Sequence, residues 1–215
     1  MHACYLYLRE ISILISLKGH KIAKSIVIGV TGTPAAGKST FAKEILGELP
    51  ESEMIELNDI VDRFKLFSDV DKLGSKIVRL KELEAKMAEI IKEKGMSRNI
   101  IVVGHLVPEI KLKYDLIVVV RANLKGLISR MERRNYQKEK IRENLVSESI
   151  DYCGVKSSEM CAETYEIENE EERRKVLNYI KERSAGKSAN KPEAKEISKM
   201  DELLELVTEG NRYGL

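Results

Sequence analysis

The sequence predicts an α/β fold of three layers, in which a five-stranded parallel sheet lies between two layers of helices. Short runs of branched aliphatic residues recur along the chain and alternate with longer segments of helical periodicity. Strands that are buried on both faces form such continuous apolar runs, and their alternation with helices favours a parallel sheet. The predicted strands are residues 25–31, 54–57, 99–103, 115–120 and 164–168.

Helices are predicted between and after these strands from the spacing of their apolar residues. The segment 78–94 is the clearest of them, because its large apolar side chains fall on one face. Residues 140–160 are predicted to continue as a helix that Gly154 weakens, since glycine is a poor helix former. The remaining predicted helices lie around 41–46 and at 60–70, 124–131, 170–183 and 201–207, and 184–192 is a predicted loop.

The composition is typical of one globular domain, with or without a decoration. The chain has 215 residues, of which 33% are charged and 43% hydrophobic, and its formal net charge is +2. This near balance of charge excludes a polybasic nucleic-acid coat and an acidic disordered tail. We therefore expect no direct sequence-specific binding of nucleic acid.

The three cysteines, Cys4, Cys153 and Cys161, are too sparse and scattered for a disulfide framework. They lack the paired spacing of a zinc site, and the three histidines do not cluster with them. A reducing, cytoplasmic compartment fits this usage best.

Residues 1–24 are predicted to be an extension whose status is open. Their apolar run, residues 11–17, is far shorter than the ~20 residues that a membrane helix needs. A signal peptide is disfavoured, because the charge of Arg9 is cancelled by Glu10. The extension is then an extra strand, a loose segment or the product of a start codon placed too far upstream. The domain proper is expected at 25–215, with no membrane contact.

A complete phosphate-binding loop follows the first predicted strand and opens a helix. It runs from Gly32 to Gly37-Lys38-Ser39, with four residues between the two glycines. Such a loop turns backbone N–H groups inward, and the helix that follows it presents its positive end. In this motif the lysine reaches the β- and γ-phosphates and the serine hydroxyl binds Mg²⁺. The sequence therefore predicts a site for ATP and Mg²⁺, and a chance glycine turn is the weaker interpretation.

The remaining sequence narrows the class of nucleotide-using protein. The chain carries no Asn/Thr-Lys-x-Asp signature for guanine and is small for a motor ATPase. Kinases of nucleotides or metabolites remain, and these need a second phosphate pocket and a cationic lid. The segment 130–143 is a candidate lid, because arginines that close over a triphosphate neutralise its charge and exclude water. A solvated helix face is the alternative interpretation of this segment.

Five segments of the sequence match one known family. They are 32–40 with Thr33-Pro34 inside the loop, Asn58-Asp59, 102–106, 127–136 and 140–144. The arginine-rich block before Tyr136 is the most specific of them. On these segments the sequence resembles the adenylate kinase isoenzyme 6 family from residue 26 to about 160, which is about two thirds of the chain.

The resemblance implies a nucleoside monophosphate kinase fold and a site. The loop would bind ATP, through Gly32, Ala35, Gly37, Lys38, Ser39 and Thr40. A monophosphate-binding flap would span 56–79 and a lid 133–143, with Arg134 contacting ATP. Outside the resemblance, the sequence itself shows a charged C-terminal region at about 169–215. Family members phosphorylate nucleoside monophosphates, hydrolyse ATP and act in maturation of the small ribosomal subunit and its 16S rRNA. They do so through transient contact with a platform ribosomal protein.

Several single residues are candidates with two interpretations each. His105, at the end of a strand, is a catalytic or water-positioning group, or a histidine hydrogen-bonded under the loop. Asp59 serves the monophosphate or the metal, or caps a helix. Arg79, with Lys76, meets the phosphate of the monophosphate, or belongs to a solvated helix face. Lys38 and Arg134 complete the predicted catalytic set.

Two residues depart from the family pattern. The family carries an acidic residue, which would hold the water shell of Mg²⁺, where this chain has Val103. Either another carboxylate such as Asp59 or Glu109 serves, or metal handling is weakened. Asn135 replaces a glycine, and asparagine tolerates the left-handed backbone well enough for the turn to form.

The sequence thus favours a kinase that transfers the γ-phosphate of ATP to AMP or a related monophosphate, with broad specificity. Two alternatives stay open: an ATP-driven ribosome assembly factor, and a non-catalytic ATP-binding module impaired by Val103.

Overall fold

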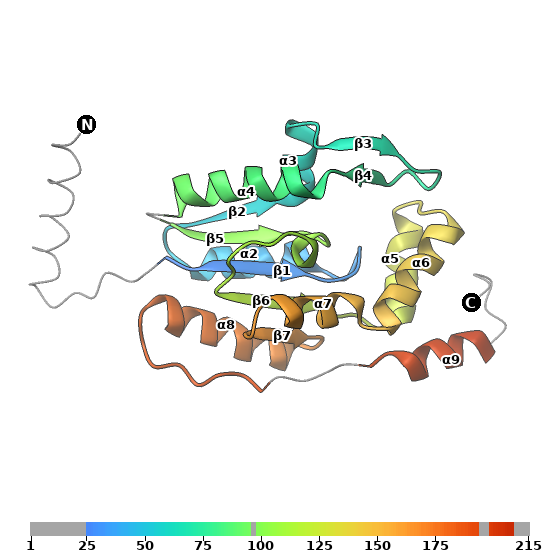
Figure 1. Cartoon of the computed structure of the whole chain (residues 1–215). Helices are drawn as coiled ribbons and strands as arrows, with labels where there is room; N and C mark the ends of the chain where they lie inside the picture. Colours follow the sequence, from blue (N-terminus) through green and yellow to red (C-terminus); the bar gives the residue numbers. More distant parts are fainter. Residues whose placement is uncertain (1–24, 96–97, 194–197, 209–215) are drawn as a thin grey trace, which may run out of the picture.

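The computed structural model describes residues 25–95, 98–193 and 198–208 (Figure 1). The interpretations of residues 1–24 lie outside the described residues. No helix within the described ranges is long and apolar enough to cross a membrane.

Five parallel strands form the central sheet, as the sequence predicts. They are β1 (Val27–Thr31), β2 (Ser52–Glu56), β5 (Asn99–Val103), β6 (Leu116–Val120) and β7 (Thr164–Ile167). Their spatial order is β2-β5-β1-β6-β7, and every neighbouring pair is parallel. Strand β1 is therefore central, and the carboxyl ends of all five strands meet at one edge of the sheet, where ligands of open α/β sheets bind.

Helices cover both faces of the sheet and complete the three layers (Figure 1). On one face, α2 (Lys38–Glu48) packs beside α8 (Glu170–Ser184), and on the other lie α4 (Leu80–Lys94) and α7 (Tyr152–Met160). The remaining helices are α3 (Leu57–Arg63), the 3₁₀ turn η1 (Val107–Glu109), α5 (Leu124–Arg133), α6 (Lys138–Ser149) and α9 (Met200–Thr208). The sheet thus carries an aliphatic core on each face, with Ile28 and Val118 on the α2 side and Val102 and Val119 on the other.

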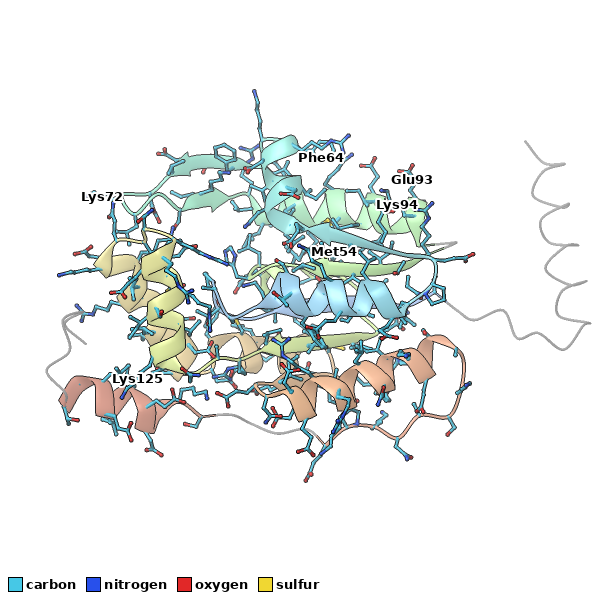
Figure 2. The ribbon with its side chains drawn as sticks, turned by 180° about the vertical axis from the view of Figure 1, so that it is seen from behind. Met54, Phe64, Lys72, Glu93, Lys94 and Lys125 are labelled. Carbon is cyan, nitrogen blue, oxygen red and sulfur yellow. The ribbon has the colours of Figure 1, made fainter. Side chains whose placement is uncertain are left out.

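Two hairpins project from the end of the sheet where the strands finish. One is the two-stranded β3 (Phe67–Val70) and β4 (Lys76–Val78), and the other is the pair of helices α5 and α6. Figure 2 shows Lys72, at the turn of the first hairpin, above the second hairpin. A hydrogen bond of 3.4 Å from Lys140 Nζ to the carbonyl of Leu73 joins the two.

The expected helix at 60–70 is wrong in both bounds. The helix begins at Leu57 and ends at Arg63, after which Lys65 takes a left-handed backbone conformation with φ of 53°. The amide of Leu66 then bonds the carbonyl of Val61 at 2.9 Å and turns the chain out of the helix. Strand β3 comes next along the chain, and its partner β4 occupies the start of the expected helix at 78–94.

The expected continuous helix at 140–160 is also wrong, because the chain breaks at Asp151 and not at Gly154. Asp151 has φ of 52°, so α6 ends at Ser149 and α7 begins at Tyr152. The Asp151 side chain accepts from the amide of Gly154 at 3.1 Å and caps α7.

A buried ionic network holds this break against the sheet. Arg121, directly after β6, is 2% exposed, and its Nε donates to Glu148 Oε1 at 2.9 Å. The same guanidinium bonds the Glu148 carbonyl at 2.8 Å, Glu166 at 2.7 Å and Asp151. One cation therefore faces three carboxylates, from α6, the α6–α7 junction and β7.

We predict that Arg121→Leu destabilises the protein by about 3–5 kcal/mol at pH 7, because it leaves buried carboxylates without their cation. The loss should shrink as the pH falls toward ~5, since uncompensated burial raises carboxyl pKa values and protonation then removes the charge. Urea unfolding at several pH values measures it. Arg98→Leu is the control, because Arg98 forms an exposed pair with Glu53 at 3.4 Å, worth ~0–1 kcal/mol. Equal losses in the two variants would contradict the prediction.

Candidate functional site

The phosphate loop joins the end of β1 to the start of α2, and its two glycines are sterically required. Gly32 has φ of 134°, and a Cβ there would lie 2.3 Å from the carbonyl oxygen of Val120 on the neighbouring strand. Gly37 has φ of 113° and immediately precedes α2. Ala35 also takes a positive φ, 69°, and its carbonyl accepts from Arg130 Nε at 2.7 Å. The chain therefore holds the loop in a left-handed, curled conformation.

Lys38 points back into this loop. Its Nζ donates to the carbonyl oxygens of Gly32 at 2.9 Å and Thr33 at 3.0 Å. Of the residues that the structure describes, no carboxylate pairs directly with this ammonium group. Burial lowers the pKa of Lys38 from 10.5 to about 8. The negative charges of Cys153, Glu56 and Glu148 act in the opposite direction and raise this pKa, but by less. A buried positive charge at a helix N-terminus is a suitable binding partner for the negatively charged phosphates of a nucleotide.

A second buried residue fixes the loop from behind. The hydroxyl of Thr33, itself 2% exposed, donates to Glu148 Oε2. Glu148 Oε1 accepts from the amide of Ala122 at 3.1 Å and from Arg121. Because the Thr33 carbonyl in turn holds Lys38, the carboxylate of Glu148 orients the lysine through Thr33. Sequence reasoning missed Glu148, since only the fold brings α6 against the loop.

A cavity of about 760 Å³ opens in front of the loop, between the two hairpins. The phosphate loop and α2 form its floor, β4 and α3 one wall, and α6 with the turn before it the opposite wall. Its lining includes Thr33, Ala35, Lys38, Ser39, Glu56, Asn58, Val61, Asp62, Lys76, Val78, Leu80, His105, Leu106, Glu109, Arg134, Tyr136, Lys140, Glu143, Asn144, Tyr152 and Cys153.

The arginine-rich segment supplies one wall of this cavity. Arg134, at the turn between α5 and α6, lines the cavity and is exposed. Asn135 has φ of 56°, which confirms that asparagine takes the left-handed position at the turn. Lys140 lies with its Nζ 5.2 Å from the centre of the Tyr136 ring. Arg134 and Lys140 thus bring positive charge to the mouth of the phosphate loop.

His105 lies at the end of β5 and lines the cavity. Loss of bulk water around the imidazole, with the charges of Lys38 and Lys140, lowers its pKa from 6.5 to about 4. The ring is therefore neutral at pH 7, and it can accept or donate a hydrogen bond there without carrying charge.

The structure does not bring Asp59 and Arg79 to the cavity. Asp59 is exposed in the first turn of α3, whose neighbours Asn58 and Asp62 line the cavity instead. The Arg79 guanidinium donates to the carbonyls of Phe67 at 2.6 Å and Lys65 at 2.9 Å, and to Glu82. These bonds fasten the β3–β4 hairpin to α4. A role for either residue in binding substrate stays a prediction.

The residues present fit a magnesium nucleotide. Ser39, in the first turn of α2, lines the cavity together with Lys38, as the motif requires. The described residues contain no group of three or more histidine, cysteine, aspartate or glutamate side chains able to hold a metal. Mg²⁺ needs no such cage, since it keeps several waters and binds through one or two carboxylates and the phosphates.

Parts of this chain are similar to known proteins. Residues 28–151 match the family model described as an AAA domain. The protein named "Putative adenylate kinase" of Methanosarcina acetivorans is 32% identical over 146 residues, which cover 66% of this chain and 76% of that one. That of Methanocaldococcus jannaschii is 32% identical over 142 residues, covering 66% and 75%. Shikimate kinase from Bacteroides thetaiotaomicron is similar with a TM-score of 0.48 and 16% identity, over 73% of this chain and 96% of that one. A likeness so distant does not bear on the substrate.

We predict that the affinity for ATP falls above pH 8. The pKa of Lys38 is about 8 in the free protein, and bound phosphates would raise it, so binding above that pH must take up a proton. The dissociation constant should then rise roughly tenfold per pH unit above ~8 and stay level below it. Titration calorimetry from pH 7 to 9.5 measures it. Lys38→Arg should flatten the profile, because arginine stays protonated, and a flat profile in the wild type would refute the idea.

We predict that Thr33→Val weakens ATP binding about tenfold, because it removes the hydroxyl that bonds the loop to Glu148. The substitution leaves a buried carboxylate oxygen without a donor, which costs about 1–3 kcal/mol of free energy. Thr33→Ser should bind ATP like the wild type. Thr164→Val is the matched control, because the hydroxyl of Thr164, at the start of β7, donates to the carbonyl of Cys161 at 2.8 Å and does not touch the loop. If Thr33→Val keeps its ATP affinity, Glu148 does not position the loop.

Proposed function

Because this chain belongs to the AAA-domain family and is related to archaeal proteins named "Putative adenylate kinase", we propose that it is a nucleoside monophosphate kinase. It would transfer the γ-phosphate of ATP to AMP or a related monophosphate, with broad specificity. Kinase homology and the α/β phosphate-loop fold support the wider class of nucleotide kinase.

The observation that carries the proposal is the extent of the cavity. It continues from the phosphate loop, at Lys38, to the β3–β4 hairpin at Lys76. The lining away from the loop mixes apolar side chains, Val61, Val78 and Leu106, with the polar Asn58, Asp62 and Lys76. Apolar surface with a few polar groups suits a base and its phosphate. One cavity therefore offers room for two phosphate-bearing substrates.

The chain's own residues would act mainly by position and charge. Lys38 binds the phosphates of ATP, and its release from the carbonyls of Gly32 and Thr33 accompanies that binding. Arg134 and Lys140 add positive charge from the opposite wall and help to exclude water. His105, neutral at pH 7, orients a phosphate or a water and brings no charge of its own. Mg²⁺, when bound with ATP through Ser39, neutralises charge on the transferred group.

Finer parts of the proposal rest on the resemblance to the adenylate kinase isoenzyme 6 family alone. These are ATP hydrolysis, a part in maturation of the small ribosomal subunit, and transient contact with a platform ribosomal protein. The division into a monophosphate flap at 56–79 and a lid at 133–143 belongs here as well. The observed hairpins β3–β4 and α5–α6 lie within and around these segments, which supports that division.

We predict that AMP or one other monophosphate raises ADP formation from ATP·Mg²⁺ many-fold and becomes the diphosphate itself. AMP, CMP, GMP and UMP are compared singly, with both products separated by chromatography. Lys38→Ala is the blank, and it should lose turnover by at least ~10³-fold, because the transition-state charge loses its principal cation.

Slow consumption of ATP with no response to any monophosphate would contradict the kinase and favour an ATP-driven assembly factor. Full turnover in Lys38→Ala would contradict the phosphate loop as the site. Binding of ATP without consumption would favour the non-catalytic module.

A further inference from the structure

We propose that Glu56, at the end of β2, is the carboxylate that holds the Mg²⁺ of the bound nucleotide. The inference rests on the proposed use of ATP·Mg²⁺ and names a residue for it. Sequence reasoning considered Asp59 and Glu109 for this part and passed over Glu56, because nothing in the sequence tells which residue lies beside position 103.

The register of the sheet places Glu56 directly beside Val103. Strands β2 and β5 are parallel neighbours (Figure 1). In their register the Cα of Glu56 is paired with that of Val103. Paired residues point to the same face, with Cβ atoms ~5 Å apart. Val103 belongs to the core on the α2 side, and Met54, two residues before Glu56, packs against the same core. Glu56 therefore lies on the face of the sheet that carries α2 and the phosphate loop.

Glu56 also faces the site itself. It lines the cavity with Lys38 and Ser39, and its charge raises the pKa of Lys38. The carboxylate is thus near the ammonium group but does not pair with it, which leaves room for a ligand between strand and loop. Its strand is part of the central sheet, so its position does not depend on either projecting hairpin.

The other carboxylates that line the cavity either have a partner already or lie on the wall opposite the sheet edge. Asp62 pairs with Lys76, and Glu109 accepts from the hydroxyl of Tyr152. Glu143 belongs to α6, on the wall opposite the sheet edge. Among the residues described, Glu56 has no direct hydrogen bond or ion pair with a side chain, although its carboxylate is half-buried.

One carboxylate at this place matches the chemistry of Mg²⁺. The ion takes oxygen ligands, keeps several of its waters and is commonly bound by one or two carboxylates together with phosphates. Ser39 supplies a hydroxyl from α2, and Glu56 supplies negative charge from the strand opposite. The valine at position 103 then does not imply weak metal handling, because the carboxylate comes from one strand further along the edge.

The test measures metal binding and not only activity. The dissociation constant of ATP is measured by calorimetry at pH 7, once with Mg²⁺ and once with EDTA. The dissociation constant with EDTA divided by that with Mg²⁺ is the gain in affinity from Mg²⁺. In Glu56→Gln, which keeps size and removes charge, we expect this gain to fall about tenfold, the lower end of the usual effect of groups that support a metal. ATP with EDTA should bind at least as tightly as in the wild type, since a negative charge beside the phosphates is gone.

Two matched variants sharpen the result. Glu143→Gln removes a second cavity carboxylate and should keep the gain of the wild type. Glu56→Gln combined with Val103→Asp should recover the gain, because the new carboxylate stands at the paired position. Electron paramagnetic resonance of Mn²⁺ with ADP gives the same comparison directly from the metal.

An unchanged gain from Mg²⁺ in Glu56→Gln would overturn the inference, as would an equal loss in Glu143→Gln. A folded double variant without recovery would also count against it. A wild type that binds no ATP would instead refute the proposed function, so the two failures are distinguishable.

Discussion

The carboxylate of Glu148 is the contact on which the geometry of the site depends. It accepts from the hydroxyl of Thr33 in the phosphate loop and from Arg121 and the amide of Ala122 after β6. Three segments far apart in the sequence therefore meet on one buried group. A buried carboxylate with this many donors is strongly oriented, because every lost bond would leave charge in a medium of low polarity. These buried bonds therefore hold the loop from behind, on the side away from the cavity.

The same contact ties the loop to the hairpin that faces it. Glu148 belongs to the last turn of α6, whose first turn carries Lys140 at the far wall of the cavity. Arg121 and Asp151 fix the end of that helix to the sheet. The first half of α6 is held as well, since Ile141 is buried in the core on the α2 side and Lys140 bonds the Leu73 carbonyl. The position of this wall and the shape of the loop therefore depend on one shared contact at Glu148.

The strands, the phosphate loop and its chemistry could be predicted from the sequence, because each has a local signal. Five apolar runs indicate the five parallel strands, and Gly32 and Gly37 mark backbone conformations that a Cβ forbids. The early end of α3 and the break at Asp151 could not be predicted, since both depend on left-handed residues that are not glycine, Lys65 and Asp151. Likewise Glu148 and Glu56 look like any charged residue until the packing of α6 and the register of β2 place them.

Register underlies the proposed metal role of Glu56, because it sets this carboxylate beside position 103, where the resemblance would place an acidic residue. At the carboxyl edge of a parallel sheet, paired residues of neighbouring strands lie side by side on one face. A charge can therefore move from one strand to the next and still reach the same ligand, provided the longer side chain spans the added distance. Glutamate at position 56, beside valine at position 103, has the extra methylene that such a shift requires. The position of the carboxylate relative to Lys38 and Ser39 matters more than which strand of the sheet edge carries it.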